Sequence, residues 1–157
     1  MRRRVILGAM AALVTVGAAP APTVIYVTRH YDTPAGERDP DLTATGAARA
    51  KALAAWFRGR TLGAIYVTGF KRTQQTIAPL ASARRLTPIV YGPAPTPEFL
   101  ARLKGAKAPV LVVGHSNTVP HIIAGLGGER PGEIAHDDFG TLWAVGAGRA
   151  VAVRILP

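Results

Sequence analysis

Residues 23–30 read TVIYVTRH, and residues 110–115 read VLVVGH. Each stretch begins with a short run of β-branched and apolar residues, which is typical of a strand buried on both faces of a parallel sheet. Each run leads directly into a histidine, His30 in the first stretch and His115 in the second. Ligands bind outside the carboxyl ends of the strands in such sheets. The two histidines are therefore predicted to lie at the functional edge of an α/β domain.

Strand-like and helix-like segments alternate along the rest of the chain. Thr43 and Thr96 are expected to cap helices, and Pro79 is expected to kink or restart one. The pattern predicts strands at residues 64–67, 88–91, 141–145 and 150–155, with a hairpin turn at 146–148. It predicts helices over 43–57 and 72–85, a third helix that starts at 96, and a fourth that follows His115 and ends near residue 126. Such alternation predicts a three-layer α/β/α sandwich with a mostly parallel central sheet.

The first 19 residues have the layout of a secretory signal peptide. Three arginines, Arg2 to Arg4, precede an apolar run over residues 5–17, and small residues follow. We expect cleavage near Ala19, export to the periplasm or the medium, and a single domain over residues 20–157. An uncleaved interfacial anchor is the alternative. The apolar run is short for a membrane-spanning helix, so no stable membrane insertion is expected after the leader is removed.

The composition narrows the classes of function. The 157-residue chain has a formal net charge of +10, which becomes +7 once the three leader arginines are removed. A basic protein attracts anionic substrates. Its basic residues are scattered with few aromatic residues between them, so no nucleic-acid partner is expected. The absence of cysteine excludes disulfides, a thiol nucleophile and a cysteine-based zinc site.

The residues at the predicted strand ends suit phosphoryl transfer. This reaction needs a nucleophile in line with the leaving oxygen and positive donors around the other phosphate oxygens. Arg29 places a guanidinium beside His30, and Arg72 is predicted to open the helix after the second strand. His115 is predicted to open a later helix, with Asn117 close enough to donate a hydrogen bond. Arginine suits the site because its planar fork can hold two phosphate oxygens.

These motifs resemble the histidine phosphatase superfamily, which includes phosphoglycerate mutases and SixA-like phosphohistidine phosphatases. The motifs are Thr28-Arg29-His30, Asp41-Leu42-Thr43 with Gly46, Arg72-Thr73 with Gln75-Thr76, and Gly114-His115-Ser116-Asn117. The resemblance covers nearly all of the mature chain. It implies that His30 forms a transient phosphohistidine, and that Arg29, Arg72 and His115 bind the phosphoryl group. It implies that Asn117 and Ser116 are further hydrogen-bond donors or helix caps. It also implies that the reaction needs neither a metal nor a cofactor.

The sequence leaves the proton donor open and departs from the family at one position. Glu98 and Asp32 are the two candidate acids, and Asp137 is a third acidic residue that follows a histidine. Position 31, where the family commonly has a small residue, is Tyr31, whose ring would narrow the pocket or stack on a substrate. His121 is expected to be structural and His136 to lie in a loop.

The leading hypothesis is a metal-independent phosphatase that acts through a phosphohistidine on His30. Its substrate would be a phosphorylated small molecule or a phosphoprotein, with hydrolysis favoured over mutase activity because a short chain has few loops to enclose an intermediate. The alternative is a catalytically weakened phosphate-binding or interaction protein on the same fold. A metal-dependent hydrolase using His30, Asp32, His115 and His136 is the third hypothesis.

Overall fold

A computed structural model describes residues 23–157, so the predicted signal peptide at residues 1–19 and its cleavage near Ala19 lie outside the described residues. A six-stranded sheet forms the centre, in the order β3-β2-β4-β1-β5-β6. The strands are β1 (Ile25–Arg29), β2 (Ala64–Val67), β3 (Ile89–Val90), β4 (Val110–Gly114), β5 (Thr141–Gly146) and β6 (Arg149–Arg154). β3, β2, β4 and β1 pair in parallel, and β5 and β6 continue the sheet antiparallel. The predicted mostly parallel sheet is confirmed.

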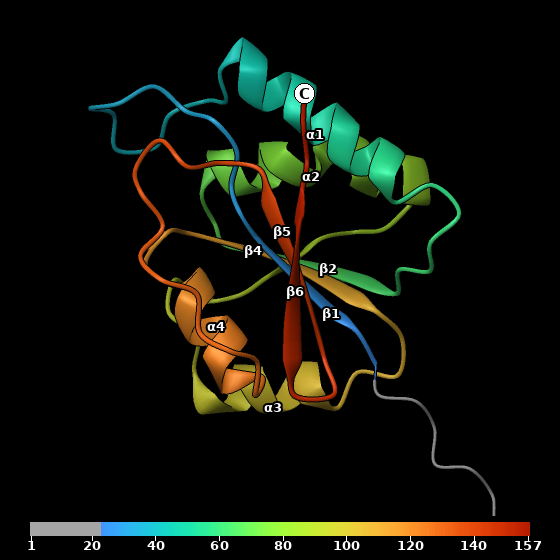
Figure 1. Ribbon diagram of the computed structural model, residues 1–157. Coiled ribbons are helices and arrows are strands. Elements are labelled where there is room, and N and C mark those ends of the chain that lie inside the picture. The colour runs from blue at the N-terminus through green and yellow to red at the C-terminus, as the bar shows by residue number, and fades with distance from the viewer. Residues whose placement is uncertain (1–22) are drawn as a thin grey trace, which may run out of the picture.

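Two helices cover each face of the sheet (Figure 1). They are α1 (Ala44–Trp56) and α2 (Lys71–Arg84) on one face, and α3 (Pro97–Lys104) and α4 (Val119–Gly125) on the other. Side chains of the central strands alternate between the two layers: Leu111 and Val113 pack under α1 and α2, whereas Val110 and Val112 pack against α3 and α4. Because both faces are covered, the strands read as continuous apolar runs. The three-layer prediction is confirmed.

The helix starts follow the predicted caps. The Thr43 hydroxyl accepts a hydrogen bond from the Gly46 amide at 3.1 Å, and the Thr96 hydroxyl accepts one from the Phe99 amide at 3.2 Å. Position 46 requires glycine because a Cβ there would collide with the backbone carbonyl oxygen of Asp32. This close approach fixes the loop after β1 against the first turn of α1.

Two local predictions are wrong. The helix does not restart at Pro79: α2 continues through it, and Ile77 and Leu80 on either side are buried in the core. His115 does not open a helix: α4 begins at Val119, and the Thr118 and Val119 amides both donate to the His115 carbonyl oxygen in the intervening turn. The predicted hairpin turn is confirmed between β5 and β6, where Ala147 and Gly148 both have positive φ.

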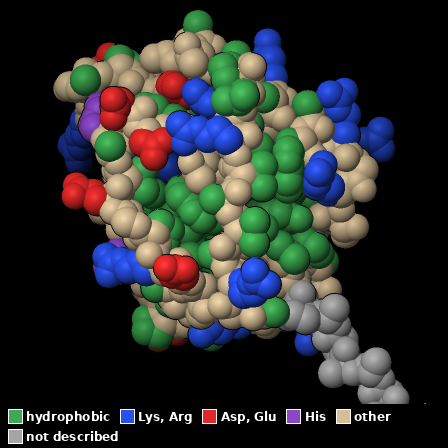
Figure 2. Space-filling model, viewed as in Figure 1, with side chains coloured by type: hydrophobic (Ala, Val, Ile, Leu, Met, Phe, Trp, Pro, Cys, Tyr) green, Lys and Arg blue, Asp and Glu red, His purple; other side chains and the backbone are tan. Residues whose placement is uncertain are grey.

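Charged side chains are spread over the surface seen in Figure 2. Lys and Arg side chains are dispersed over this face with apolar surface between them, and Asp and Glu side chains lie among those on its left. Within residues 23–157, no helix combines the length and the apolar character needed to cross a membrane.

Candidate functional site

The carboxyl ends of β1 and β4 bring the two predicted histidines together. Arg29 and Gly114 are partners in the parallel register, and the His30 amide donates to the Gly114 carbonyl oxygen at 2.9 Å. One residue beyond each strand, the rings of His30 and His115 lie 5.4 Å apart. β2 ends next to β4, and α2, which follows it, brings in Arg72. The sheet topology therefore assembles three of the predicted site residues at one edge.

His30 is a neutral imidazole with one free ring nitrogen. Its Nδ1 lies 2.9 Å from the Tyr31 carbonyl oxygen, which can only accept, so Nδ1 carries the proton and Nε2 keeps its lone pair. Burial lowers the pKa of His30 to about 3, and the nearby positive charges of Arg29 and Arg72 contribute to the shift. The geometry thus leaves Nε2 as a nucleophile over the whole physiological pH range.

His115 has the opposite tautomer. Arg72 Nη2 lies 3.4 Å from its Nδ1 and can only donate, so the proton is on Nε2, which donates to the Thr68 hydroxyl at 3.0 Å. Thr68 Oγ1 lies 3.1 Å from Thr73 Oγ1, and Thr73 in turn donates to the Phe70 carbonyl oxygen at 2.8 Å. Burial, followed by the charge of Arg72, lowers the pKa of His115 to about 4. The site therefore holds two uncharged imidazoles.

Arg72 is held at the edge of the site by the loop that follows β1. Its Nη1 donates to the Arg38 carbonyl oxygen at 3.2 Å and lies 3.5 Å from Asp39 Oδ1, and its guanidinium stacks on the Phe70 ring. The same loop is anchored to α2, because Asp39 Oδ1 also accepts from the Lys71 amide at 3.0 Å. The loop of residues 33–41 thus forms one wall of the site.

Arg29 is buried and binds backbone groups of a second loop. Its Nη1 donates to the carbonyl oxygens of Ala135 and Asp138 at 2.8 and 3.0 Å, and its Nη2 donates to that of His136 at 2.9 Å. The guanidinium lies 4.0 Å over the Phe139 ring. Its Nε is buried without a hydrogen-bond partner among the described residues. Burial lowers the pKa of Arg29, although the group stays charged. Arg29 therefore fastens the loop of residues 135–138 and keeps part of its fork for a ligand.

Two hollows open onto His30. The smaller, about 180 Å³, lies between the two loops, where Arg29, Arg72, Glu37 and His136 line it. The larger of the two, about 360 Å³, is lined by His30, Arg72, Phe70, Pro93, His115, Ser116 and Asn117. Positive side chains and two imidazoles thus surround a space next to the free Nε2 of His30, which suits a phosphate group.

The structure brings His30, Arg29, Arg72, His115 and Asn117 to this edge of the sheet, and it places the two candidate acids elsewhere. Glu98 lies at the start of α3 and lines a separate hollow with Tyr66 and Tyr91. Asp32 is engaged by Arg49, whose Nε lies 2.9 Å from Asp32 Oδ2. Neither carboxyl lines the hollows beside His30.

Glu37 is the acidic residue that the sequence reasoning missed. It is the one carboxyl side chain among the described residues that line the hollows beside His30. The one feature of the sequence that points to Glu37 is its position in the polar loop directly after the Arg29-His30 pair. Because loop conformation sets which of several nearby acids faces the site, this residue could be identified only from the fold.

Tyr31 does not reach the pocket. Its ring is fully buried in the core cluster with Leu53, Phe57 and Ile77, under α1 and α2. The expectation that it narrows the pocket or stacks on a substrate is therefore wrong, because alternation along the extended chain turns position 31 to the opposite face from His30.

The remaining histidines lie in different surroundings. His121 is exposed on α4, 3.4 Å from Arg130 Nη2. His136 lies in the loop bound by Arg29 and lines the smaller hollow. Over residues 23–157, no three His, Cys, Asp or Glu side chains are grouped so that they could hold a metal ion.

Comparisons with known proteins agree with the predicted resemblance. Residues 25–93 match the histidine phosphatase superfamily (branch 1). This segment contains Arg29, His30 and Arg72, and it ends before His115. A search of curated protein sequences found no match.

Several solved structures share the fold. The protein histidine phosphatase SixA complexed with tungstate has a TM-score of 0.64 and 19% identity, with 85% of this chain and 96% of that chain covered. The alpha-ribazole phosphatase from Shigella flexneri has a TM-score of 0.61 and 16% identity, with 86% and 96% covered. A mycobacterial glucosyl-3-phosphoglycerate phosphatase has a TM-score of 0.61 and 14% identity, with 78% and 89% covered. At these identities the likeness shows the fold.

Proposed function

Since residues 25–93 match the histidine phosphatase superfamily and the described chain has the fold of a solved protein histidine phosphatase, we propose that this protein is a metal-independent phosphomonoesterase. The observation that carries the proposal is the free Nε2 of His30 beside a hollow lined by Arg29 and Arg72. The matched superfamily takes its name from its histidine phosphatases. The substrate is a phosphorylated small molecule or a phosphohistidine-bearing protein.

In the first step, Nε2 of His30 attacks phosphorus while the bond from phosphorus to the leaving atom breaks. The leaving atom is the ester oxygen of a phosphomonoester, or the imidazole nitrogen of a phosphohistidine-bearing protein. Glu37, the carboxyl that lines the hollow, gives its proton to that atom. Arg29 and Arg72 stabilise the charge on the other phosphate oxygens. The products are the free alcohol, or the free histidine of the protein substrate, and a phosphohistidine on His30.

In the second step, water attacks the phosphohistidine. The Glu37 carboxylate accepts a proton from this water, the nitrogen–phosphorus bond breaks, phosphate leaves, and Nε2 regains its lone pair. The negative charge of the phosphoryl group raises the pKa of the adjacent His115. Protonation of Nδ1 then turns His115 into a donor. It also releases Arg72 Nη2, which otherwise hydrogen-bonds to that nitrogen, to bind the phosphate.

The proposal is tested with the purified protein, an aryl phosphate and a chelator, beside a His30→Asn variant whose fold is checked by circular dichroism. We expect turnover that withstands the chelator and disappears in the variant. Rapid acid-free quenching should trap a phosphoryl label on His30 that is stable in alkali and labile in acid. Anion binding without turnover would support the phosphate-binding alternative, and turnover abolished by the chelator would support the metal-dependent one.

We also propose that the protein acts outside the cytoplasm. The support is the sequence of residues 1–19, with its arginines, apolar run and small residues. Cell fractionation of the full chain and of a chain starting at residue 20 tests this. Equal retention of both chains in the cytoplasm would contradict it.

A further inference from the structure

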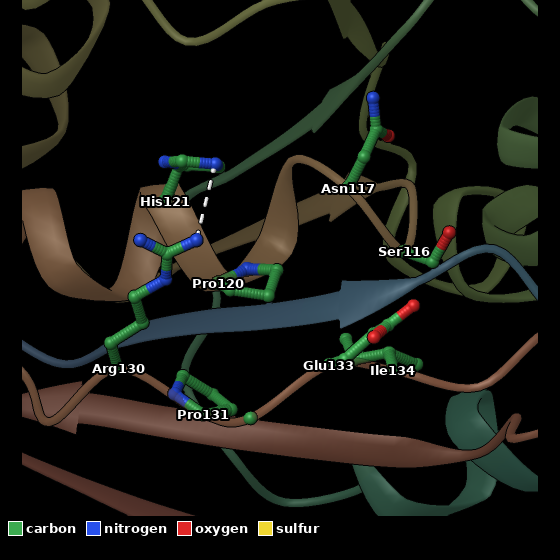
Figure 3. Close-up of a pocket in the computed structure, with 9 residues that line it drawn as sticks. Ser116, Asn117, Pro120, His121, Arg130, Pro131, Glu133 and Ile134 are labelled. Atoms are coloured by element: carbon green, nitrogen blue, oxygen red, sulfur yellow. Dashed lines mark hydrogen bonds between the residues drawn. The ribbon is translucent and has the colours of Figure 1, made fainter.

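A further hollow lies beside the proposed active site, over the start of α4. It has a volume of about 510 Å³, and Figure 3 shows the side chains that line it. They come from the turn before α4, from α4 itself and from residues 130–134. Pockets for small ligands have volumes of about 300–1,000 Å³. The hollow is therefore large enough for a metabolite-sized group.

This hollow lies next to the one that His30 lines. Ser116 and Asn117 line both the 510 Å³ hollow and the 360 Å³ hollow, and His30, Arg72 and His115 also line the latter. A molecule with its phosphate beside His30 would reach the larger space by extending past Ser116 and Asn117.

The polar side chains of the hollow differ between its two ends. Ser116, Asn117 and Glu133 lie at the end nearer the proposed active site, whereas His121 and Arg130 lie together at the far end (Figure 3). Arg130 is exposed, and it takes part in none of the ion pairs found in residues 23–157. Its Nη2 lies 3.4 Å from Nε2 of His121.

The far end therefore presents a charged guanidinium with most of its N–H groups free, next to an imidazole ring. A guanidinium of this kind binds a carboxylate or a phosphate group. The near end offers a hydroxyl, an amide and a carboxylate, which suit the hydroxyl groups of a polar linker. Together with a phosphate beside His30, the hollow fits a molecule that is anionic at both ends.

We propose that this hollow binds the leaving group of the substrate, and that the substrate is a small phosphomonoester with a second anionic group, bound by Arg130 and His121. The inference rests on the proposed function, because it takes the phosphate to lie beside His30. It selects a small molecule over a phosphoprotein. A carboxylate and a second phosphate share the required chemistry.

The test measures binding, so it does not depend on turnover. Alkylphosphonates of increasing chain length, ending in methyl, carboxylate or phosphonate, are titrated calorimetrically at fixed ionic strength. We expect one chain length at which a terminal anion tightens binding about ten-fold over the methyl form. The better of the two anionic ends identifies the second group as carboxylate or phosphate.

Two variants locate the effect. Arg130→Gln should abolish the preference for the anionic end and leave the affinity for the methyl form unchanged. Arg58→Gln makes the same change in charge at an exposed residue just after α1, on the other face of the sheet, and should keep the preference. A general electrostatic attraction would instead be reduced equally by both.

The outcomes separate this inference from the proposed function. An anionic-end preference in a protein without phosphatase activity would support the subsite and refute the function. Phosphatase activity with no preference at any chain length would refute the subsite and leave the function standing. A third outcome would favour a protein substrate and overturn the inference. In that case the native protein and Arg130→Gln would hydrolyse a phosphohistidine protein at equal rates, and neither would prefer any of the phosphonates.

Discussion

The imidazole rings of His30 and His115, 85 positions apart in the sequence, lie 5.4 Å from each other and are both uncharged. Burial lowers their pKa values from 6.5 to about 3 and about 4, respectively. Arg29 and Arg72 add positive charge around both rings. A site arranged in this way disfavours a third positive charge until an anion arrives, and it keeps the nucleophile unprotonated.

This arrangement predicts that acid destabilises the fold. Between a pH of about 4 and 6.5, the unfolded chain protonates both histidines and the folded chain protonates neither. Stability therefore rises with pH through this window and falls as the pH is lowered. Each histidine should contribute a slope of up to about 1.4 kcal/mol per pH unit.

Urea unfolding at several pH values through this window measures the effect. His30→Asn and His115→Asn should each flatten the dependence by about one proton. His121→Asn, which replaces an exposed histidine on α4, is the control and should keep the native slope. Identical slopes in the native protein and in both buried-site variants would contradict the prediction.

If Glu37 is the proton donor, the effect of replacing it should depend on how much the leaving group needs a proton. Glu37→Gln should slow hydrolysis of alkyl phosphates by about 100-fold or more, because their leaving oxygen needs a proton. It should slow hydrolysis of 4-nitrophenyl phosphate much less, because nitrophenolate leaves unprotonated. The measurement is kcat/KM for both substrates.

Glu98→Gln removes the same charge at the start of α3, away from the hollows beside His30, and serves as the control. It should change neither rate. If the two variants behave alike with alkyl phosphates, Glu37 is not the donor.

We expect the substitution Arg29→Lys to lower both the free energy of unfolding and the phosphatase activity. Lysine keeps the charge, but it lacks the fork that donates to the carbonyl oxygens of Ala135, His136 and Asp138. Hydrogen bonds to charged groups contribute about 1.5–3 kcal/mol each, so we expect a loss of at least about 2 kcal/mol in the free energy of unfolding. Proteolytic cleavage within residues 135–138 should become faster.

Arg149→Lys, at the exposed start of β6, is the matched control and should leave both quantities unchanged. Native stability and native proteolysis in Arg29→Lys would mean that the loop is held without Arg29. A loss of activity alone would assign Arg29 to phosphate binding only.

The sequence predicted the fold because its local signals and its tertiary packing agree. The run at residues 110–113 is buried on both faces, and it reads as a buried strand for that reason. Thr43 and Thr96 were identifiable because a hydroxyl cap depends only on the adjacent turn. The predicted restart at Pro79 does not occur, because the packing of α2 against the core outweighs the local cost of the proline.

The site was predictable where strands position it and unpredictable where loops do. His30 and His115 follow directly from two strands, so strand prediction placed them at one edge. Glu37 lies in a loop whose path is set by the contacts of Asp39 with Lys71 and Arg72, and no local pattern encodes those contacts. The additional role of Arg29 in holding residues 135–138 depends on a separation of more than 100 residues in sequence.

Tyr31 provides the most direct test of how the residue after the nucleophile acts. Its hydroxyl is buried without a hydrogen bond of normal geometry among residues 23–157, and burial raises its pKa, while the nearby Thr28 side chain acts in the opposite direction. An unpaired buried hydroxyl costs about 1–3 kcal/mol, so Tyr31→Phe should leave the free energy of unfolding unchanged or raise it. Because the ring lies in the core, hydrolysis of an aryl phosphate should be unaffected.

Tyr91→Phe is the matched control, since it removes the same atom from a buried ring whose hydroxyl donates to the Val113 carbonyl oxygen at 3.1 Å. It should lose about 1 kcal/mol of stability. If Tyr31→Phe is destabilised as much as Tyr91→Phe in thermal and urea unfolding, the Tyr31 hydroxyl has a partner in solution. If Tyr31→Phe instead loses activity at native stability, the hydroxyl acts on the phosphoryl site, because its removal would then change His30 chemistry without changing the core.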